Sequence, residues 1–296
     1  MDIRRFLHDE RLPAEYAEAI ERVHRPLAQA IDVRSRTSEH LVIGLCGAQG
    51  SGKSTMARSL CSLLDTQGIS CVVLSLDDLY LTHAERRSLA KRIHPLLATR
   101  GVPGTHDVQL GLELLDALRQ SRPVAIPVFD KSADDRKPVD EWPRVQRPVQ
   151  VVLFEGWCVG AVPQEDAALA RPVNALERER DSEGRWRRFV NDALRSPYQD
   201  LFGSIDALIL LQAPSFDVVY DWRLEQEHKL RDRLAASGRA ARVMSDEEVA
   251  RFISHFERLT RHILSEMPAG ADAVVRLNER REPIDLVMRG RLSAVP

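Results

Sequence analysis

The 296-residue chain contains few cysteines and few aromatic residues, and it has no marked excess of either charge. Its 4 cysteines show no C-x-x-C spacing, so neither a zinc site nor a disulfide framework is indicated. A net charge of −2 supplies no electrostatic basis for binding nucleic acid or an anionic membrane. We therefore expect no nucleic-acid partner and only local basic sites. The composition leaves monomer and homodimer open.

Long apolar runs are also missing. No apolar run approaches the roughly 18 residues of a membrane-spanning helix, and the first residues (Met1–Arg5) lack the apolar stretch of a secretory signal. These absences predict no membrane partner and a cytoplasmic location, which fits the sparse cysteines of a reducing compartment. Hydrophobic residues make up 44% of the chain, enough to build a sizeable core.

One short segment, Gly47–Thr55, is rich in glycine and matches the pattern G-x-x-x-x-G-K-[ST]. The apolar run Leu41–Cys46 before it predicts a parallel strand buried on both faces. Apolar residues at helical spacing follow until Gly68, which suits a helix C-cap. In this context backbone N–H groups converge on phosphate oxygens at a helix N-terminus. We predict a nucleoside triphosphate site made of Gly47, Ala48, Gln49, Gly50, Ser51, Gly52, Lys53, Ser54 and Thr55.

Side chains near this loop suggest phosphate and metal contacts. Lys53 is expected to reach the β- and γ-phosphates of ATP, and the Ser54 hydroxyl to ligate Mg²⁺. Glu155 directly follows another apolar strand, Val151–Phe154. An acidic residue at that place suits a direct or indirect role in Mg²⁺ binding, although Asp is more usual there. The sequence thus predicts ATP and Mg²⁺ as cofactors.

A second apolar strand, Cys71–Leu76, delivers Asp77 and Asp78 at its carboxyl end. Ligands of open α/β sheets bind at that edge, although Asp residues also cap turns. Further strands are predicted at 207–211 and, as the last short strand, at 273–277. Their alternation with helices predicts a three-layer α/β fold with a parallel sheet. Together with the phosphate loop and the basic helix considered below, this predicts the P-loop NTPase fold with a helical lid.

Apolar spacing between residues 16 and 27 predicts helix over residues 1–38, interpreted as an N-terminal helical extension. Residues 39–296 then form the catalytic domain. The charged residues within 161–200 predict a solvated excursion with a helix near 186–195. Ser245 and Glu248 form a capping box for a helix whose apolar face continues to residue 259.

Two loops between these strands, within about 97–148, contain candidate substrate residues. In Arg100–Asp107, turn chemistry explains the Pro and the second Gly, and the final Asp suits the N-cap of a helix whose apolar stretch is 110–118. Neither role explains Arg100 and His106, which could serve an anionic ligand. The proline-punctuated segment 123–129, which leads into 130–136, suits a substrate-side hairpin or loop better than a central strand. The helix expected from Phe216 is rich in Arg and Lys. This basic face is either solvated or part of a lid, about 216–240, closing over the triphosphate.

Several of these segments resemble motifs of the phosphoribulokinase/uridine kinase class of P-loop kinases. Ser75–Tyr80 is similar to its S-x-D-[SD]-[FL]-Y motif, which implies that Asp77 is the catalytic base. Ile126–Asp130 resembles its I-P-x-Y-D substrate segment, with Phe in place of Tyr. Leu230–Asp232 resembles the L-R-D of its lid helix, which implies a catalytic role for Arg231 near the transferred phosphoryl group.

A closer resemblance is to the D-glycerate 3-kinase branch of this class, over about residues 40–285. It implies an ATP-dependent phosphotransferase whose small-molecule hydroxyl acceptor is D-glycerate. The loops in which the class places its acceptor then make Arg100, His106, Lys131 and Arg136 substrate residues. A uridine- or pantothenate-like acceptor is the alternative within kinases. A P-loop NTPase switch is the alternative outside them, but it would have no use for Asp77. The segments resembling the branch are Arg100–Asp107, Phe129–Ser132, Phe154–Trp157, Trp222–Leu224 and Met244–Glu248.

Overall fold

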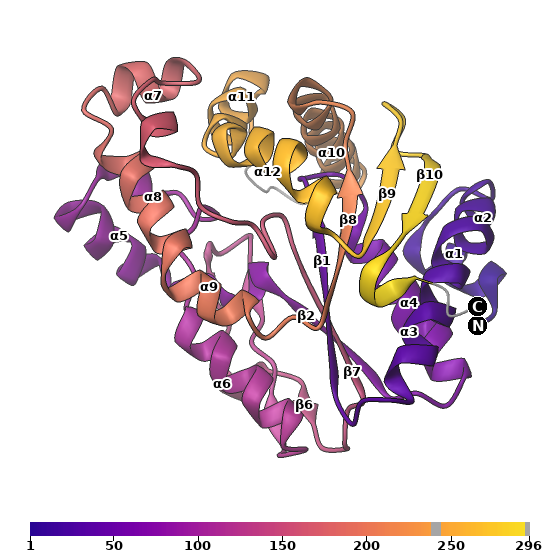
Figure 1. The fold of residues 1–296 in the computed structure, drawn as a ribbon. Helices are drawn as coiled ribbons and strands as arrows, with labels where there is room; N and C mark the ends of the chain where they lie inside the picture. Colours follow the sequence, from indigo (N-terminus) through magenta and orange to yellow (C-terminus); the bar gives the residue numbers. More distant parts are fainter. Residues whose placement is uncertain (238–243, 294–296) are drawn as a thin grey trace.

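The computed structural model describes residues 1–237 and 244–293 of the chain. At its centre lies a six-stranded sheet with the strand order β10-β9-β8-β1-β7-β2 (Figure 1). Its strands run parallel except β10, which is antiparallel to β9 at one edge. This mostly parallel α/β sheet confirms the predicted fold class. The strands are β1 (Leu41–Gly47), β2 (Cys71–Ser75), β7 (Val151–Gly156), β8 (Ala207–Gln212), β9 (Ala273–Leu277) and β10 (Pro283–Met288).

Two small antiparallel pairs lie outside this sheet. They join β3 (Val124–Ala125) to β6 (Arg144–Val145), and β4 (Phe129–Asp130) to β5 (Asp135–Arg136). The second pair is a hairpin, one of the two forms that the sequence left open for this region.

Helices surround the sheet, and short 3₁₀ turns connect several elements. The helices are α1 (Ile3–Glu10), α2 (Tyr16–Ala19), the π-helical η1 (Ile20–His24), α3 (Arg25–Ser35), α4 (Lys53–Thr66), α5 (His83–Arg92), α6 (Val108–Arg119), α7 (Ala175–Arg180), α8 (Arg185–Arg195), α9 (Pro197–Phe202), α10 (Phe216–Ser237), α11 (Asp246–Ser254) and α12 (Glu257–Gly270). The 3₁₀ turns are η2 (Leu76–Leu79), η3 (Pro95–Ala98), η4 (Val139–Glu141), η5 (Asp166–Leu169) and η6 (Gly290–Leu292).

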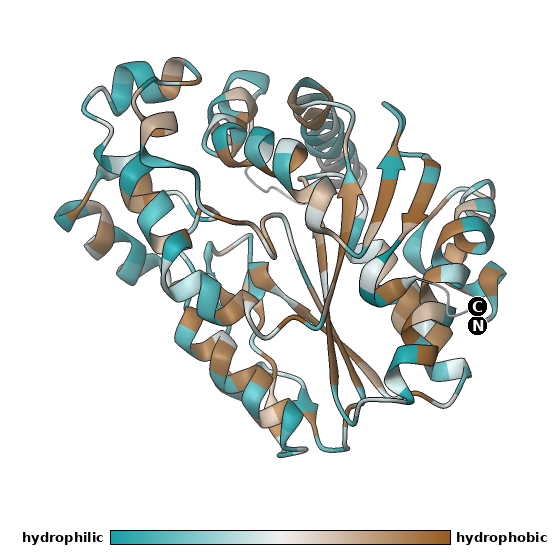
Figure 2. Ribbon diagram, viewed as in Figure 1, coloured by the Kyte–Doolittle hydropathy of each residue, from teal (hydrophilic) through white to brown (hydrophobic). Residues whose placement is uncertain are grey.

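Strand β1 occupies the middle of the sheet, and every one of its residues is buried. It pairs with β7 on one side and with β8 on the other, so both of its faces are covered and a continuous apolar run is required. Figure 2 shows the same pattern across the sheet, where hydrophobic strands lie inside helices with hydrophilic outer faces. The parallel register aligns the carboxyl ends of β1, β7 and β2 at one edge, pairing Ser75 with Glu155.

The helical layers lie on opposite faces of the sheet. Helix α4 packs against β1, β2 and β7, and α3 covers α4 (Figure 1). On the other face α12 contacts β8, and the ring of Phe202 in α9 lies 6.4 Å from that of Phe154 in β7. Helix α6 in turn packs on α9. Helices therefore cover both faces, as a three-layer arrangement requires.

The N-terminal helices pack directly on the phosphate-loop helix. The buried His24 ring shares a 2.9 Å hydrogen bond between its Nδ1 and the Ser59 hydroxyl of α4. Arg58 of α4 donates two 2.6 Å hydrogen bonds to the Glu10 carboxylate. Leu27 of α3 belongs to the same apolar core as the sheet. The extension is therefore a structural support of α4.

Three expectations about elements need correction. The charged stretch before the helix at 185–195 is not wholly solvated, because Glu177 and Asp181 are buried. The helix that Ser245 caps was expected to continue to residue 259, but it ends at Ser254, and a separate helix, α12, begins at Glu257. A further strand, β10, follows the one expected to be last. Within the described residues, no helix has both the length and the apolarity needed to cross a membrane.

Candidate active site

The phosphate loop adopts the backbone that its glycines predict. Gly50 and Gly52 have φ values of +80° and +89°, a left-handed conformation that residues with a Cβ rarely adopt. A Cβ at Gly50 would also lie 2.8 Å from the Cβ of Trp222 in α10. Helix α4 then begins at Lys53. The loop connects the carboxyl end of β1 to the N-terminus of α4. A helix N-terminus in this position binds phosphate.

Lys53, Ser54 and Glu155 meet beside this loop. The Ser54 hydroxyl donates a 2.8 Å hydrogen bond to Oε1 of Glu155, and Ser75 donates a 3.0 Å hydrogen bond to the same oxygen. Lys53 Nζ lies 4.0 Å from Oε2 of Glu155. That second oxygen is buried and has no hydrogen-bond partner in the described part of the chain. A buried carboxylate that accepts serine hydroxyls on one oxygen, while its second oxygen faces only a lysine at 4.0 Å, is suited to bind a further cation.

This donor set fits Mg²⁺. The ion prefers hard oxygen ligands and is usually held by one or two carboxylates together with substrate phosphates and water. Ser54 and Glu155 offer such oxygens, and no group of three or more His, Cys, Asp or Glu residues in the described chain forms a self-sufficient metal site. A Mg²⁺ ion held by these oxygens would take further ligands from the triphosphate and water, as the ion usually does.

Asp77 lies in η2, just beyond the carboxyl end of β2. Strand β7 lies between β2 and β1, the strand that leads into the phosphate loop. Tyr80 donates a 2.6 Å hydrogen bond to Oδ1 of Asp77, and the Lys131 ammonium donates one of 2.6 Å to its Oδ2. Burial by itself raises the pKa of this carboxyl. The charges of Lys131 and Lys53 and these two hydrogen bonds outweigh burial, so the pKa of Asp77 lies well below its usual range. Asp77 is an ionised carboxylate at any physiological pH.

Asp78 points to a different partner. Its Oδ1 accepts a 3.0 Å hydrogen bond from the backbone N–H of Phe129, the first residue of the β4–β5 hairpin. Burial, with a further contribution from the charge of Asp77, raises the pKa of Asp78 to about 6. The two neighbouring carboxylates therefore have different roles, since Asp77 faces the cations and Asp78 fastens the hairpin.

The hairpin also carries a second ion pair. Its residue Asp134 pairs with Nη1 of Arg100, and Arg86 Nη2 lies 3.0 Å from Oδ2 of the same carboxylate. The Arg100 and Arg86 guanidinium carbons lie 5.6 and 5.9 Å from the centre of the Phe129 ring. The sequence reasoning missed Arg86 and Asp134. Arg86 is one of several basic residues in a charged helix, and only the fold distinguishes it by burying it.

Arg136 and His106 lie among the same loops but make different contacts. Arg136 donates a 2.9 Å hydrogen bond to the backbone carbonyl of Tyr80 and lies 3.4 Å from Asp107, so it ties the hairpin to the η2 segment. His106 is buried, and its Nδ1 lies 2.5 Å from the Tyr198 hydroxyl. Burial lowers the pKa of His106 to about 3. This histidine is neutral at physiological pH and can serve an anion only as an uncharged donor.

Helix α10, the expected lid, is anchored in the core at its start. Trp222 is buried against the phosphate loop, and its indole donates a 2.6 Å hydrogen bond to the carbonyl of Glu279. Arg231 donates a 3.2 Å hydrogen bond to the Met244 carbonyl and lies 3.7 Å from Asp246, so it faces the start of α11. Residues 238–240 of the expected lid lie outside the described residues.

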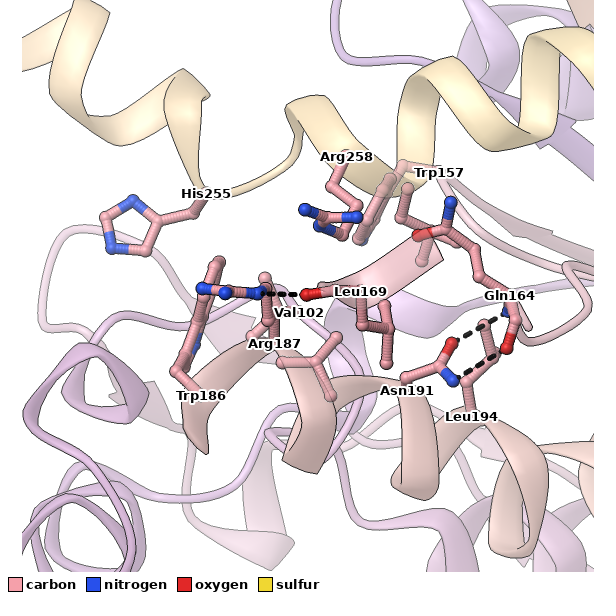
Figure 3. A pocket seen from close by; sticks show the side chains of 12 residues that line it. Val102, Trp157, Gln164, Leu169, Trp186, Arg187, Asn191, Leu194, His255 and Arg258 are labelled. Atoms are coloured by element: carbon pink, nitrogen blue, oxygen red, sulfur yellow. Dashed lines mark hydrogen bonds between the residues drawn. The ribbon is translucent and has the colours of Figure 1, made fainter. Parts of the chain in front are cut away.

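A small cavity lies behind the Arg100–Asp107 loop (Figure 3). Val102 of that loop lines it together with Trp157, Arg187 of α8 and Arg258 of α12. Its volume of about 20 Å³ has room for a single water molecule. The two arginines already pair with the buried carboxylates of Asp181 and Glu177. The cavity is too small to hold an acceptor.

Comparisons with known proteins agree with this geometry. Residues 42–165 match the model of the phosphoribulokinase/uridine kinase family. The chain is 39% identical over 230 residues to the uncharacterized kinase mug58 of Schizosaccharomyces pombe, covering 73% of this chain and 78% of that protein. It is 33% identical to the chloroplastic D-glycerate 3-kinase of Arabidopsis thaliana, covering 82% of this chain but only 54% of the plant protein.

A solved structure shares the fold along almost its whole length. The D-glycerate 3-kinase of Cryptococcus neoformans superimposes with a TM-score of 0.72 at 26% identity, covering 91% of this chain and 99% of the other. The phosphate loop, the carboxylates at the sheet edge and these relatives agree on one kind of chemistry, the use of ATP on a small molecule. The chain belongs to the phosphoribulokinase/uridine kinase family and is a phosphotransferase that uses an alcohol group as acceptor.

Proposed function

We propose that the protein transfers the γ-phosphoryl group of ATP, with Mg²⁺, to a hydroxyl group of D-glycerate. The observation that carries this proposal is the pair of cations, Lys131 and Arg100, in the loops that flank the carboxylate of Asp77. A short hydroxy acid needs a base for its hydroxyl and a fork of donors for its carboxylate, which arginine supplies. The resemblance to two D-glycerate 3-kinases supports the same acceptor.

On the nucleotide side, the backbone N–H groups of Gly50–Lys53 cradle the phosphates, and Lys53 contacts the β- and γ-phosphates. Ser54 and Glu155 would hold Mg²⁺, which would supply positive charge to neutralise the phosphate oxygens. Glu155 is itself held by the hydroxyl of Ser75, so it needs little rearrangement.

On the acceptor side, Asp77 accepts the proton of the attacking hydroxyl and orients its oxygen in line with the leaving group. The transition state of phosphoryl transfer is loose, so the proton moves late and a carboxylate with a low pKa suffices. Tyr80 holds one oxygen of Asp77, which leaves the oxygen now occupied by Lys131 for the acceptor. Arg231 approaches the transferred phosphoryl group when α10 moves as a lid.

The test is ADP release by the purified protein with a panel of acceptors: D-glycerate, L-glycerate, glycerol, uridine and pantothenate, each with and without Mg²⁺. We expect kcat/KM for D-glycerate to exceed that for the other acceptors, and activity to require Mg²⁺. A preference for uridine or pantothenate would refute D-glycerate as the acceptor, while the assignment as a small-molecule kinase would stand. Equal activity in the presence of a chelator would refute the requirement for Mg²⁺.

A further inference from the structure

The tip of the β4–β5 hairpin, Lys131–Asp134, covers both charged groups of the acceptor side. Lys131 lies on the carboxylate of Asp77, with the 2.6 Å contact described above. Asp134, three residues on, lies on the guanidinium of Arg100. The hairpin tip therefore pairs the ammonium of Lys131 with the proposed base, Asp77. It also pairs the carboxylate of Asp134 with Arg100, which is proposed to bind the acceptor. These are the charges that a bound hydroxy acid would have to displace.

The hairpin tip is braced as one unit. The carboxylate of Asp130 accepts hydrogen bonds from the hydroxyl and the backbone N–H of Ser132, at 2.5 and 2.8 Å, and a 3.3 Å hydrogen bond from the N–H of Ala133. Asp134 closes the turn with a left-handed backbone at φ +54°. Because this turn is held together internally, a shift of Asp134 is transmitted to Lys131.

Only one of the two arginines that contact Asp134 can exchange partners. The Arg86 side chain is 1% exposed, and the carbonyls of Leu81 and Ala98 hold it in place without the hairpin. Its remaining hydrogen bond, 2.7 Å to the Asp134 carbonyl, is one that a shift of the hairpin tip has to lengthen or break. The Arg100 side chain is 23% exposed, and that of Asp134 is 37% exposed. Solvent and a small anion reach this second pair. A partly exposed ion pair is also weak enough to be replaced.

We propose that Asp134 is a built-in competitor of the acceptor's carboxylate and so helps to select the acceptor. An acceptor that carries a carboxylate replaces Asp134 on Arg100, the hairpin tip shifts, and Lys131 leaves Asp77 free to take the hydroxyl proton. A neutral alcohol gains nothing from Arg100 and leaves the base covered. Water is likewise denied the base, which limits wasteful ATP hydrolysis. This inference rests on the proposed carboxylate-bearing acceptor.

The test compares Asp134→Asn and Asp134→Gly with wild type and with Asp140→Asn. The glycine variant suits the left-handed φ at this position, and Asp140 is an exposed residue of the same segment, so it controls for the change in net charge. KM for D-glycerate, KM for glycerol, KM for ATP and the rate of ATP hydrolysis without acceptor are measured, with thermal unfolding as a check of folding.

We expect both Asp134 variants to lower KM for D-glycerate by about 2- to 5-fold, the range of a partly exposed ion pair. ATP hydrolysis without acceptor should rise, while KM for ATP and for glycerol stays the same. An unchanged or raised KM for D-glycerate would overturn the inference, because Asp134 would then only hold Arg100 in place. If wild type phosphorylates no carboxylate-bearing acceptor, the proposed function fails and the inference with it. A wild type active on D-glycerate with insensitive variants refutes the inference alone.

Discussion

The nucleotide side and the proposed acceptor side of this site are built in different ways. The phosphate loop is one contiguous segment, Gly47–Thr55, whose function lies mainly in its backbone. The acceptor side gathers η2, the loop before α6 and the β4–β5 hairpin, and polar side chains such as Asp77 and Arg136 join these segments. Backbone cradles bind what every kinase of the family shares. Side-chain networks between distant loops can change, so they are suited to distinguish acceptors.

The sharpest way to test the nucleotide side is to remove Lys53 or Ser54. Lys53→Ala should lower kcat by about 10³–10⁵-fold, the scale of a cation acting on the transferred phosphoryl group. Neither side chain contributes to the apolar face of α4, so the thermal unfolding midpoint should stay close to that of wild type. Lys91→Ala, at an exposed lysine of α5, is the matched control. Near wild-type turnover of Lys53→Ala at saturating ATP would refute the phosphate-loop assignment.

Two neighbouring carboxylates provide the next contrast. Asp77→Asn should lower kcat by about 10²–10⁴-fold, the usual contribution of a general base, with little change in the affinity for an ATP analogue. Asp78→Asn should cost less, because Asp78 contacts the backbone of Phe129 and not the reacting groups. The measurement is kcat together with equilibrium binding of the ATP analogue. A reversed order would show that the base is assigned one residue too early.

Substitution of Arg100 should affect KM for the acceptor and KM for ATP differently. Arg100→Ala should raise KM for the acceptor by about 10- to 100-fold, the range expected when a charged hydrogen bond is lost. KM for ATP should change far less, because the guanidinium contacts the hairpin and not the phosphate loop. Steady-state kinetics with each substrate varied in turn gives both constants. Equal losses for both substrates would make Arg100 a structural residue.

The support of the phosphate-loop helix should depend on pH. Burial lowers the pKa of His24 to about 4, below its value of about 6.5 in an unfolded chain. The unfolded state then binds more protons between these pH values, so the stability contributed by neutral His24 is present above pH 6.5 and lost as pH falls toward 4. The expected loss at pH 5 is about 2 kcal/mol. Urea unfolding of wild type and His24→Gln at pH 7 and pH 5 measures it, and an identical pH dependence for both proteins would contradict it.

The smallest effect concerns the lid. Arg231 contacts the Met244 carbonyl and Asp246, so closure over the triphosphate must break those contacts. Arg231→Ala should lower kcat by about tenfold or more if the guanidinium reaches the phosphoryl group. Hydrogen exchange of α10 should slow when a nucleotide and an acceptor are bound together. No added protection, together with a silent Arg231→Ala, would rule out the lid.

Much of the nucleotide side could be predicted because its signals are local. The buried strand, the glycines at positive φ and the start of α4 follow from residues that are adjacent in the chain. The N-cap of α6 at Asp107 and the capping box at Ser245 were predicted for the same reason, because a cap is formed within one helical turn. Asp77 and Glu155 were found because parallel strands end at a shared edge.

The contacts of the proposed acceptor side were predicted only in part. Lys131 and Arg100 could be singled out as cations in loops, but their pairing with carboxylates could not. Lys131 meets Asp77 across 54 residues of chain, and Arg100 meets Asp134 across 34. The buried charges were missed for a similar reason. Glu177 pairs with Arg258, 81 residues away, and a local charge pattern does not distinguish a buried residue from a solvated one.

The sequence by itself therefore determined the sheet, the phosphate loop and the chemistry of phosphoryl transfer, since hydrophobic periodicity and glycine backbone freedom act over a few residues. Only the tertiary structure decided which charged side chains pair with one another and which are buried. It separated Asp77 from Asp78 by direction, made His106 neutral by burial and placed Asp134 on Arg100. These outcomes depend on desolvation and on distances between segments far apart in the chain, and no local pattern of residues encodes either quantity.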